Sequence, residues 1–156
     1  PSVLISIFSL FLFSFALEKY FDKKVTTVVN NSYELARNYV EEMVNYAKDE
    51  ASSLGIEISD IEWVPGSYEA PLAASRLLTR GGVQGVVCLG VIEKGETDHG
   101  LVIGQAVSAA LIDLQIKFGK PVGLGIIGPG AEEFHIGPRL EPHARSAIRA
   151  VYSMLD

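Results

Sequence analysis

The residues best suited to chemistry lie together in the segment Leu89–His99, which contains glycines, a hydroxyl group, acidic side chains, a lysine and a histidine. Gly95 precedes a helical pattern, and a glycine-bearing turn at a helix N-terminus presents backbone N–H groups to an anion, usually a phosphate. His99 stands at the start of that pattern, and an imidazole can accept and donate protons near neutral pH. The segment therefore predicts a phosphate cradle beside an acid–base histidine.

Apolar residues flank this segment on both sides. Val86–Leu89 predict a buried strand, and residues 101–118 carry apolar side chains at helical spacing. The segment from Leu89 to His99 is therefore expected to be a loop that leads from a strand into a helix. In an open parallel sheet, loops at the carboxyl ends of the strands are where ligands bind.

The same alternation of strand and helix continues through most of the chain. Strands are predicted at residues 25–29, 56–64, 85–89 and 122–127, and helices at residues 33–53, 67–80, 99–118 and 139–155. Four β–α units in series predict a parallel sheet with helices on both faces. The expected fold class is α/β, a flavodoxin-like three-layer αβα sandwich with a four-stranded parallel sheet.

Further polar side chains follow the other predicted strands, so they should meet at the same edge of the sheet. They are Asn30, Asn31, Ser32 and Tyr33, then Ser67, Tyr68 and Glu69, and finally His135 and Arg139. Together they suit a polyhydroxylated ligand that bears a phosphate. Each also has a structural explanation, since Glu69 can compensate a helix dipole, Thr97 can cap a helix, and His135 and His143 suit the surface. The residues alone leave the chemistry unspecified.

Composition narrows the classes of partner. The chain has 156 residues with 48% apolar side chains and a net charge of -6, which argues against a nucleic-acid partner. Cys88, the single cysteine, rules out an internal disulfide, and its place in an apolar strand predicts an inert core residue. The histidines at 99, 135 and 143 lack zinc-ligand spacing, so no metal site is predicted.

Residues 1–23 differ from the rest of the chain in being strongly apolar. Their length suits a signal-peptide core, but no basic residue precedes the apolar run. The alternatives are a targeting segment and an arm packed on this subunit or on a neighbour. We expect an N-terminal arm of uncertain role, residues 1–23, followed by a single domain, residues 24–156.

Two motifs resemble those of the lumazine synthase family, which acts in riboflavin biosynthesis. Val64–Pro71 resembles the family's Val-Pro-Gly-x-aromatic-Glu-x-Pro signature, and Leu89-Gly90 with Gly95–His99 resembles its Leu-Gly-x4-Gly-x-Thr-x-His signature. Residues 120–130, followed by Arg139, look like the archaeal-type branch of the family. The resemblance covers roughly residues 24–155.

The resemblance implies a reaction and a set of site residues. Members of this family condense 5-amino-6-(ribitylamino)uracil with 3,4-dihydroxy-2-butanone 4-phosphate to 6,7-dimethyl-8-ribityllumazine, phosphate and water, without a metal or redox cofactor. His99 matches the proton-transfer residue. The matched substrate-binding positions are Gly95, Glu96 and Thr97 with Arg139 for the phosphate, Ser67, Tyr68 and Glu69 for the ribityl chain, and Val91 and Ile92 beside the uracil.

The family also assembles, as pentamers or as icosahedral shells built from them, with each active site between neighbouring subunits. Leu124 matches a position that faces the adjacent subunit's pocket. The resemblance thus implies a cytoplasmic homo-oligomeric enzyme that takes small-molecule substrates and no nucleic acid, and it predicts that a monomer is inactive.

The chain departs from the family pattern at two places. An aromatic residue normally ends the first strand and stacks on the uracil, whereas this chain has Asn30, so Asn31 or Tyr33 is the candidate for stacking. Two positions after His99 the family has an acid, whereas this chain has Leu101. These departures keep two alternatives open: a non-catalytic lumazine- or flavin-binding or shell-forming homologue, and an archaeal-type riboflavin synthase, which shares the fold.

Overall fold

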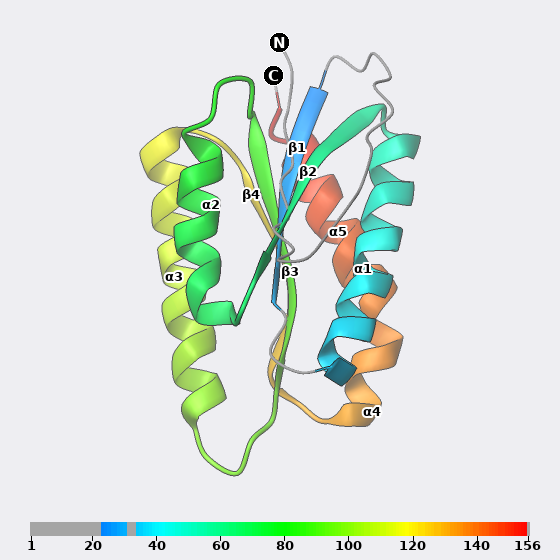
Figure 1. Ribbon diagram of the computed structural model, residues 1–156, viewed down its shortest axis with the longest axis vertical. Coiled ribbons are helices and arrows are strands. Elements are labelled where there is room, and N and C mark those ends of the chain that lie inside the picture. The colour runs from blue at the N-terminus through cyan, green and yellow to red at the C-terminus, as the bar shows by residue number, and fades with distance from the viewer. Residues whose placement is uncertain (1–22, 31–33, 156) are drawn as a thin grey trace.

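A four-stranded, all-parallel sheet runs through the middle of the computed structural model, which describes residues 23–30 and 34–155 (Figure 1). The strands are β1 (Lys23–Asn30), β2 (Ile56–Val64), β3 (Gly85–Glu93) and β4 (Val122–Ala131), in the order β2-β1-β3-β4. From β1 the chain moves to β2 on one side and then crosses to β3 and β4 on the other. The topological switch point of the sheet therefore lies between β1 and β3. The predicted fold class is confirmed.

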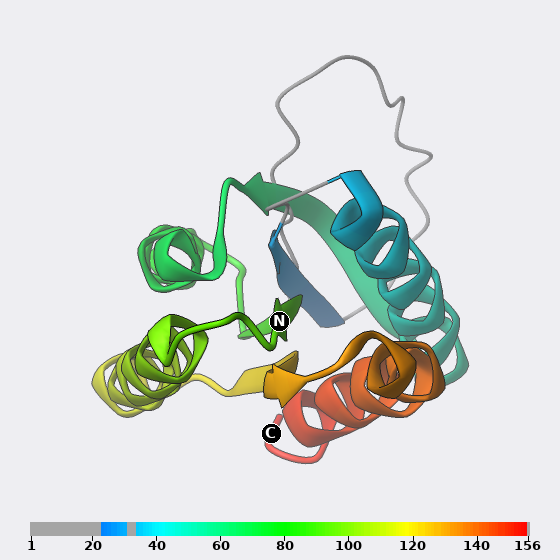
Figure 2. The same ribbon diagram turned by 90° about the horizontal axis from the view of Figure 1, so that it is seen from below.

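Helices cover both faces of the sheet, as Figure 2 shows. Helices α1 (Glu34–Ser53) and α5 (Leu140–Tyr152) pack together on one face, and α2 (Ala70–Leu78) and α3 (His99–Phe118) pack together on the other. A four-residue helix, α4 (Glu133–Ile136), follows β4. Two short 3-10 helices, Ser67–Glu69 and Gly137–Arg139, lead into α2 and α5 respectively.

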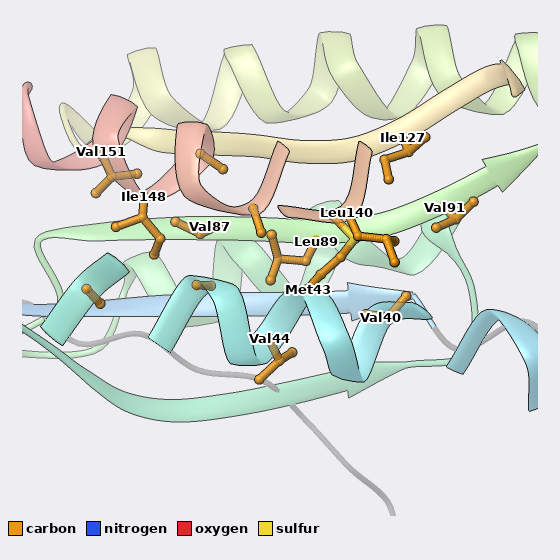
Figure 3. Packing of buried hydrophobic residues seen from close by; sticks show 14 of the residues in the cluster. Val40, Met43, Val44, Val87, Leu89, Val91, Ile127, Leu140, Ile148 and Val151 are labelled. Atoms are coloured by element: carbon orange, nitrogen blue, oxygen red, sulfur yellow. The ribbon is translucent and has the colours of Figure 1, made fainter. Parts of the chain in front are cut away.

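The core has two halves, one on each side of the sheet. Val87, Leu89 and Val91 of β3 point toward α1 and α5, where they join residues such as Met43 and Ile148 (Figure 3). The alternate residues Val86 and Cys88 belong to the cluster under α2 and α3. Because β3 is a central strand with helices on both faces, residues 85–92 are all buried and show no polar alternation.

Cys88 is completely buried in that second cluster, as predicted for an inert core residue. Burial raises the pKa of its thiol to about 12, so the reactive thiolate is scarce at neutral pH.

Three strands, β1, β3 and β4, are longer than predicted. The prediction that the third strand ends at Leu89 is wrong, because β3 continues to Glu93 alongside β4. Residues Gly90 and Val91 pair with Ile126 and Ile127 of β4. Each strand supplies the hydrogen-bonding partners that extend the other, and a local sequence pattern contains no information about such a distant partner.

Two helices start later than predicted. The second helix was expected from Ser67, but residues 67–69 form a 3-10 turn and α2 begins at Ala70, with Pro71 in its first turn. The last helix was expected from Arg139, but α5 begins at Leu140. Proline occurs near each of these starts, where its missing N–H costs no helical hydrogen bond.

A buried carboxylate joins α1 to α5. Glu50 of α1 is 6% exposed, and it accepts hydrogen bonds from Arg149 at 2.5 Å and from Arg145 at 3.0 Å. The hydrogen bonds from Arg149 and Arg145 outweigh the effect of burial and lower the pKa of Glu50. A carboxylate paired in this way stabilises the helix pair only while it is ionised.

The outer face of α3 is apolar. Within the described part of the chain, α3 is the helix that is long and apolar enough to cross a membrane, judged by length and composition alone, and 17% of its apolar stretch is buried. Val102, Ile112 and Ile116 are 62%, 52% and 74% exposed. The described part of the chain therefore leaves a row of apolar side chains on α3 uncovered.

The predicted N-terminal arm lies outside the described residues, apart from Lys23, which begins β1. The candidate stacking residues Asn31 and Tyr33 also lie outside them.

Candidate active site

The loop after β3 lies at the lower end of the sheet in Figure 1. It borders an open cleft at the carboxyl ends of β3 and β4. The cleft has a volume of about 380 Å³, and its lining includes Lys94, Gly95, Glu96 and Thr97. The backbone N–H of Lys94 donates to the Ala131 carbonyl at 2.8 Å, which ties the start of the loop to the end of β4. Gly95, Glu96 and Thr97 are all exposed, so their polar groups are open to a ligand.

His99 is the first residue of α3, where the sequence predicted it. Its backbone N–H lies 3.4 Å from the Thr97 hydroxyl oxygen, a weak hydrogen bond across the turn. The imidazole side chain is exposed. The residues on either side of it, Asp98 and Gly100, both line the cleft. His99 itself is not among the lining residues, so it lies beside the cleft, whose lining also contains the carboxylates of Glu93, Glu96 and Asp98.

Arg139 lies in a second pocket. This pocket has a volume of about 260 Å³ and is lined by Arg139 together with His135, His143 and the end of β4. Pro129 and Gly130 line both the cleft and the pocket. Within one chain, the end of β4 is thus a wall between Arg139 and the loop at Gly95–Thr97, and the two predicted phosphate-binding groups do not share a pocket.

The residues matched to the ribityl chain form the 3-10 turn before α2. Ser67 is buried, Tyr68 is 70% exposed and Glu69 is exposed. The turn contacts both α3 and β3. None of the three residues lines the cleft or the Arg139 pocket.

The apolar residues of the predicted site fall into two groups. Val91 and Ile92 were expected in a loop, but both are buried in the last part of β3, at 5% and 8% exposure. Leu124 lies on β4, at the end of the strand order, and is 50% exposed. Leu101 is 46% exposed and lines the cleft.

Sequence reasoning missed several residues at this edge. Lys94 forms an ion pair at 2.7 Å with Glu132, which precedes α4. The hydrogen bond and charge of the partner raise the pKa of Lys94 and lower that of Glu132. His135 and His143 were interpreted as surface residues, but they share the pocket of Arg139. Their spacing of four residues on either side of Arg139 was the available signal, since such residues share a helix face.

Comparison with known proteins supports the same conclusion as the motifs. A sequence model of the family described as 6,7-dimethyl-8-ribityllumazine synthase matches residues 24–156. This chain belongs to the 6,7-dimethyl-8-ribityllumazine synthase family. The resemblance inferred from the motifs is thereby confirmed, and family membership makes the chain a transferase of riboflavin biosynthesis.

Several relatives carry the name 6,7-dimethyl-8-ribityllumazine synthase. The protein from Staphylothermus marinus is 46% identical over 114 residues, which is 73% of this chain and 76% of that protein. The protein from Aeropyrum pernix is 36% identical over 133 residues, covering 84% of this chain and 88% of its own length. The protein from Methanoculleus marisnigri is 37% identical over 110 residues, or 70% of this chain and 81% of that protein.

Among the described residues of this family member, no group of three or more histidine, cysteine, aspartate or glutamate side chains is arranged to hold a metal ion. The groups present at the cleft and beside it can bind an anion through N–H groups and a hydroxyl and can transfer a proton through an imidazole.

Proposed function

We propose that this protein condenses 5-amino-6-(ribitylamino)uracil with 3,4-dihydroxy-2-butanone 4-phosphate to form 6,7-dimethyl-8-ribityllumazine, phosphate and water. The observation that carries this proposal is the exposed Gly95–Thr97 loop, which lines a cleft and leads directly into His99 at the start of α3. The family match over residues 24–156 supports the same reaction. No metal or redox cofactor takes part, and the proposed compartment is the cytoplasm, as the family resemblance implies.

The loop and Arg139 bind the phosphate of the butanone substrate. The backbone N–H groups of residues 95–97 and the Thr97 hydroxyl lie at the N-terminus of α3, where the helix dipole favours an anion. The Arg139 guanidinium supplies a counter-charge and two parallel donors. The same groups stabilise the phosphate as it leaves, since they are already oriented toward its charge.

His99 moves protons during the condensation. An amine of the uracil attacks the ketone carbon, and a proton must reach the carbonyl oxygen so that it departs as water when the imine forms. Phosphate loss and ring closure each need a further proton transfer. The imidazole is exposed beside the cleft and suits such transfers near neutral pH. Positioning of the two reactants supplies much of the remaining rate enhancement.

The remaining site residues bind the other substrate. The turn at Ser67, Tyr68 and Glu69 carries hydroxyl and carboxylate groups that suit the ribityl chain. Val91 and Ile92, at the end of β3, border the uracil ring. Asn31 or Tyr33 stacks on that ring, although both lie outside the described residues.

The active site lies between neighbouring subunits of a pentamer or a larger shell. Three features of the isolated chain support this assembly. Apolar side chains on α3 are uncovered. Leu124 is half exposed on β4, where it can face an adjacent subunit's pocket. The Pro129–Gly130 wall separates Arg139 from the loop of its own chain, so a neighbour's loop is the better partner for this arginine.

A non-catalytic binding or shell-forming role is the second candidate. Leu101 favours it, because an apolar side chain lines the cleft where relatives carry an acid that can orient the histidine. Such a protein would bind the lumazine without making it.

The test is to mix the purified oligomer with both substrates and follow lumazine absorbance above the rate without protein. The enzyme proposal predicts protein-dependent product formation and a particle at least as large as a pentamer in analytical ultracentrifugation. Lumazine binding without product formation by an intact oligomer would reject catalysis and favour the second candidate.

A further inference from the structure

Arg139 shares its pocket with two histidines. His135, Arg139 and His143 follow one another at intervals of four residues, across α4, the 3-10 turn and the first turn of α5, and all three line the pocket. Among the described residues that line this pocket there is no aspartate or glutamate. In a chain with a net charge of -6, this is an unusually favourable place for an anion.

A hydrogen bond from the backbone determines the tautomer and the orientation of the His135 ring. Its Nδ1 accepts a hydrogen bond from the Glu132 backbone N–H at 3.1 Å, so in this arrangement the ring proton is on Nε2. Its backbone carbonyl accepts a hydrogen bond from Arg139 Nη1 at 2.9 Å. His135 therefore has an N–H donor left for a ligand, and it also orients the arginine that it accompanies.

His143 is held one helical turn beyond Arg139, on the same face of α5. It is partly buried, and within the described residues no hydrogen bond to its ring is present. Glu141, two residues before His143, pairs with Arg145 at 2.8 Å. Glu132 interacts electrostatically with His135 but also pairs with Lys94 at 2.7 Å. The His143 imidazole is thus available to a ligand.

A phosphate monoester needs more than one positioned side chain. It carries close to two negative charges at neutral pH and presents several strong acceptor oxygens. An arginine fork satisfies two of them. Removing such a dianion from water with one guanidinium alone would leave acceptors unpaired, which is costly in a partly enclosed pocket.

We propose that His135 and His143 donate hydrogen bonds, together with Arg139, to the phosphate of the butanone substrate and so determine its affinity. This inference rests on the proposed function, because it assigns two further residues to the phosphate subsite of that reaction. It predicts that loss of either imidazole weakens the phosphate-bearing substrate and not the ribitylaminouracil.

The test compares His135→Phe and His143→Phe with His135→Gln and His143→Gln, because glutamine retains an N–H donor and phenylalanine does not. Each Phe variant is expected to raise KM for the butanone phosphate about tenfold, with KM for the aminouracil unchanged and much of the affinity retained by the Gln variants. Lys48→Gln is the matched control, since it removes an exposed cation of α1 that lines a different pocket, beside the start of β2. Ultracentrifugation must show each variant at the parent's size.

Calorimetric titration with inorganic phosphate separates this inference from the proposed function. If the parent makes no lumazine but binds phosphate more tightly than both Phe variants, the reaction is wrong and the subsite is right. If the parent makes lumazine and both Phe variants keep its KM for the butanone phosphate, the histidines do not bind the phosphate. An equal rise in KM for both substrates would likewise overturn the assignment.

Discussion

The ammonium group of Lys94 lies 2.7 Å from a carboxylate oxygen of Glu132, so an ion pair connects the loop after β3 to the residue that caps α4. The backbone reinforces the connection, since the Lys94 N–H donates to the Ala131 carbonyl. The two side chains are 58% and 45% exposed, which limits the effect of the pair on the stability of the whole protein. Its influence should instead be local, because it restrains the loop that is proposed to bind the phosphate.

Replacing Glu132 by glutamine should loosen that loop with little change in global stability. Amide hydrogen exchange at residues 94–98 is expected to quicken and KM for the butanone phosphate to rise, because the loop must then be ordered on binding. The pair lowers the pKa of Glu132, so its effect is lost as pH falls through that lowered value. Glu133→Gln is the neighbouring control, and equal exchange in the two variants would reject the role of the pair.

Replacing His99 by alanine should reduce turnover far more than binding. Loss of a positioned acid–base group typically slows a reaction by about 10²- to 10⁴-fold. The measurement is kcat and both KM values by lumazine absorbance, together with a fluorescence titration of product binding. Asp113→Asn, at an exposed position further along α3, serves as the control. A His99→Ala protein that turns over at the parent's rate would remove this residue from the mechanism.

Replacing Arg139 by alanine should mainly weaken the phosphate-bearing substrate. A charged hydrogen-bonding partner contributes about 1.5–3 kcal/mol, so KM for the butanone phosphate should rise roughly 10- to 100-fold. Arg139→Lys keeps the charge but loses the planar fork, so its KM for the butanone phosphate should lie between those of the parent and of Arg139→Ala. Unchanged affinity for the butanone phosphate in the alanine variant would contradict the assignment.

Replacing Glu50 by glutamine should destabilise the α1–α5 pair by about 2 kcal/mol, because two arginines lose their carboxylate partner. The folded pKa of Glu50 is lowered, so its contribution is present above the unfolded value of about 4.3 and is lost as pH falls through the folded value. Urea unfolding should therefore separate parent and variant at pH 7 and bring them together in acid.

The control for this prediction is Glu41→Gln, on the same helix, where the side chain is 49% exposed and pairs with Arg37. It should change the free energy of unfolding less than Glu50→Gln does. A gap between parent and Glu50→Gln that persists unchanged in acid would show that packing, and not charge, is responsible.

Replacing Gly104 by valine should displace Pro129 and Gly130, which separate the cleft from the Arg139 pocket. A Cβ at Gly104 would lie 2.8 Å from Cδ of Pro129, so α3 and the end of β4 must move apart. Overpacking of this kind costs about 1–3 kcal/mol, and KM for the butanone phosphate should rise as the wall shifts. Gly81→Ala is the control, since its added Cβ meets nothing within 4 Å. Parental stability and kinetics in Gly104→Val would disprove the close packing.

Much of the site could be predicted from local sequence. The apolar run at residues 86–89 predicted the buried part of β3, because a central strand has no polar face. The start of α3 at His99 was also predicted, since the glycine, threonine and aspartate before it favour a turn into a helix. The two motifs then supplied the family and the reaction, which composition and spacing had left unspecified.

The sequence by itself determined the elements, the fold class and the chemical types gathered at one edge of the sheet, because these depend on neighbouring residues in the chain. Only the tertiary structure decided the strand order, the extension of β3 to Glu93 and the pairing of Lys94 with Glu132. It also decided that Pro129 and Gly130 separate Arg139 from Thr97, and that His135 and His143 join that arginine. Each of these depends on contacts between segments far apart in the chain, which no local pattern of side chains encodes.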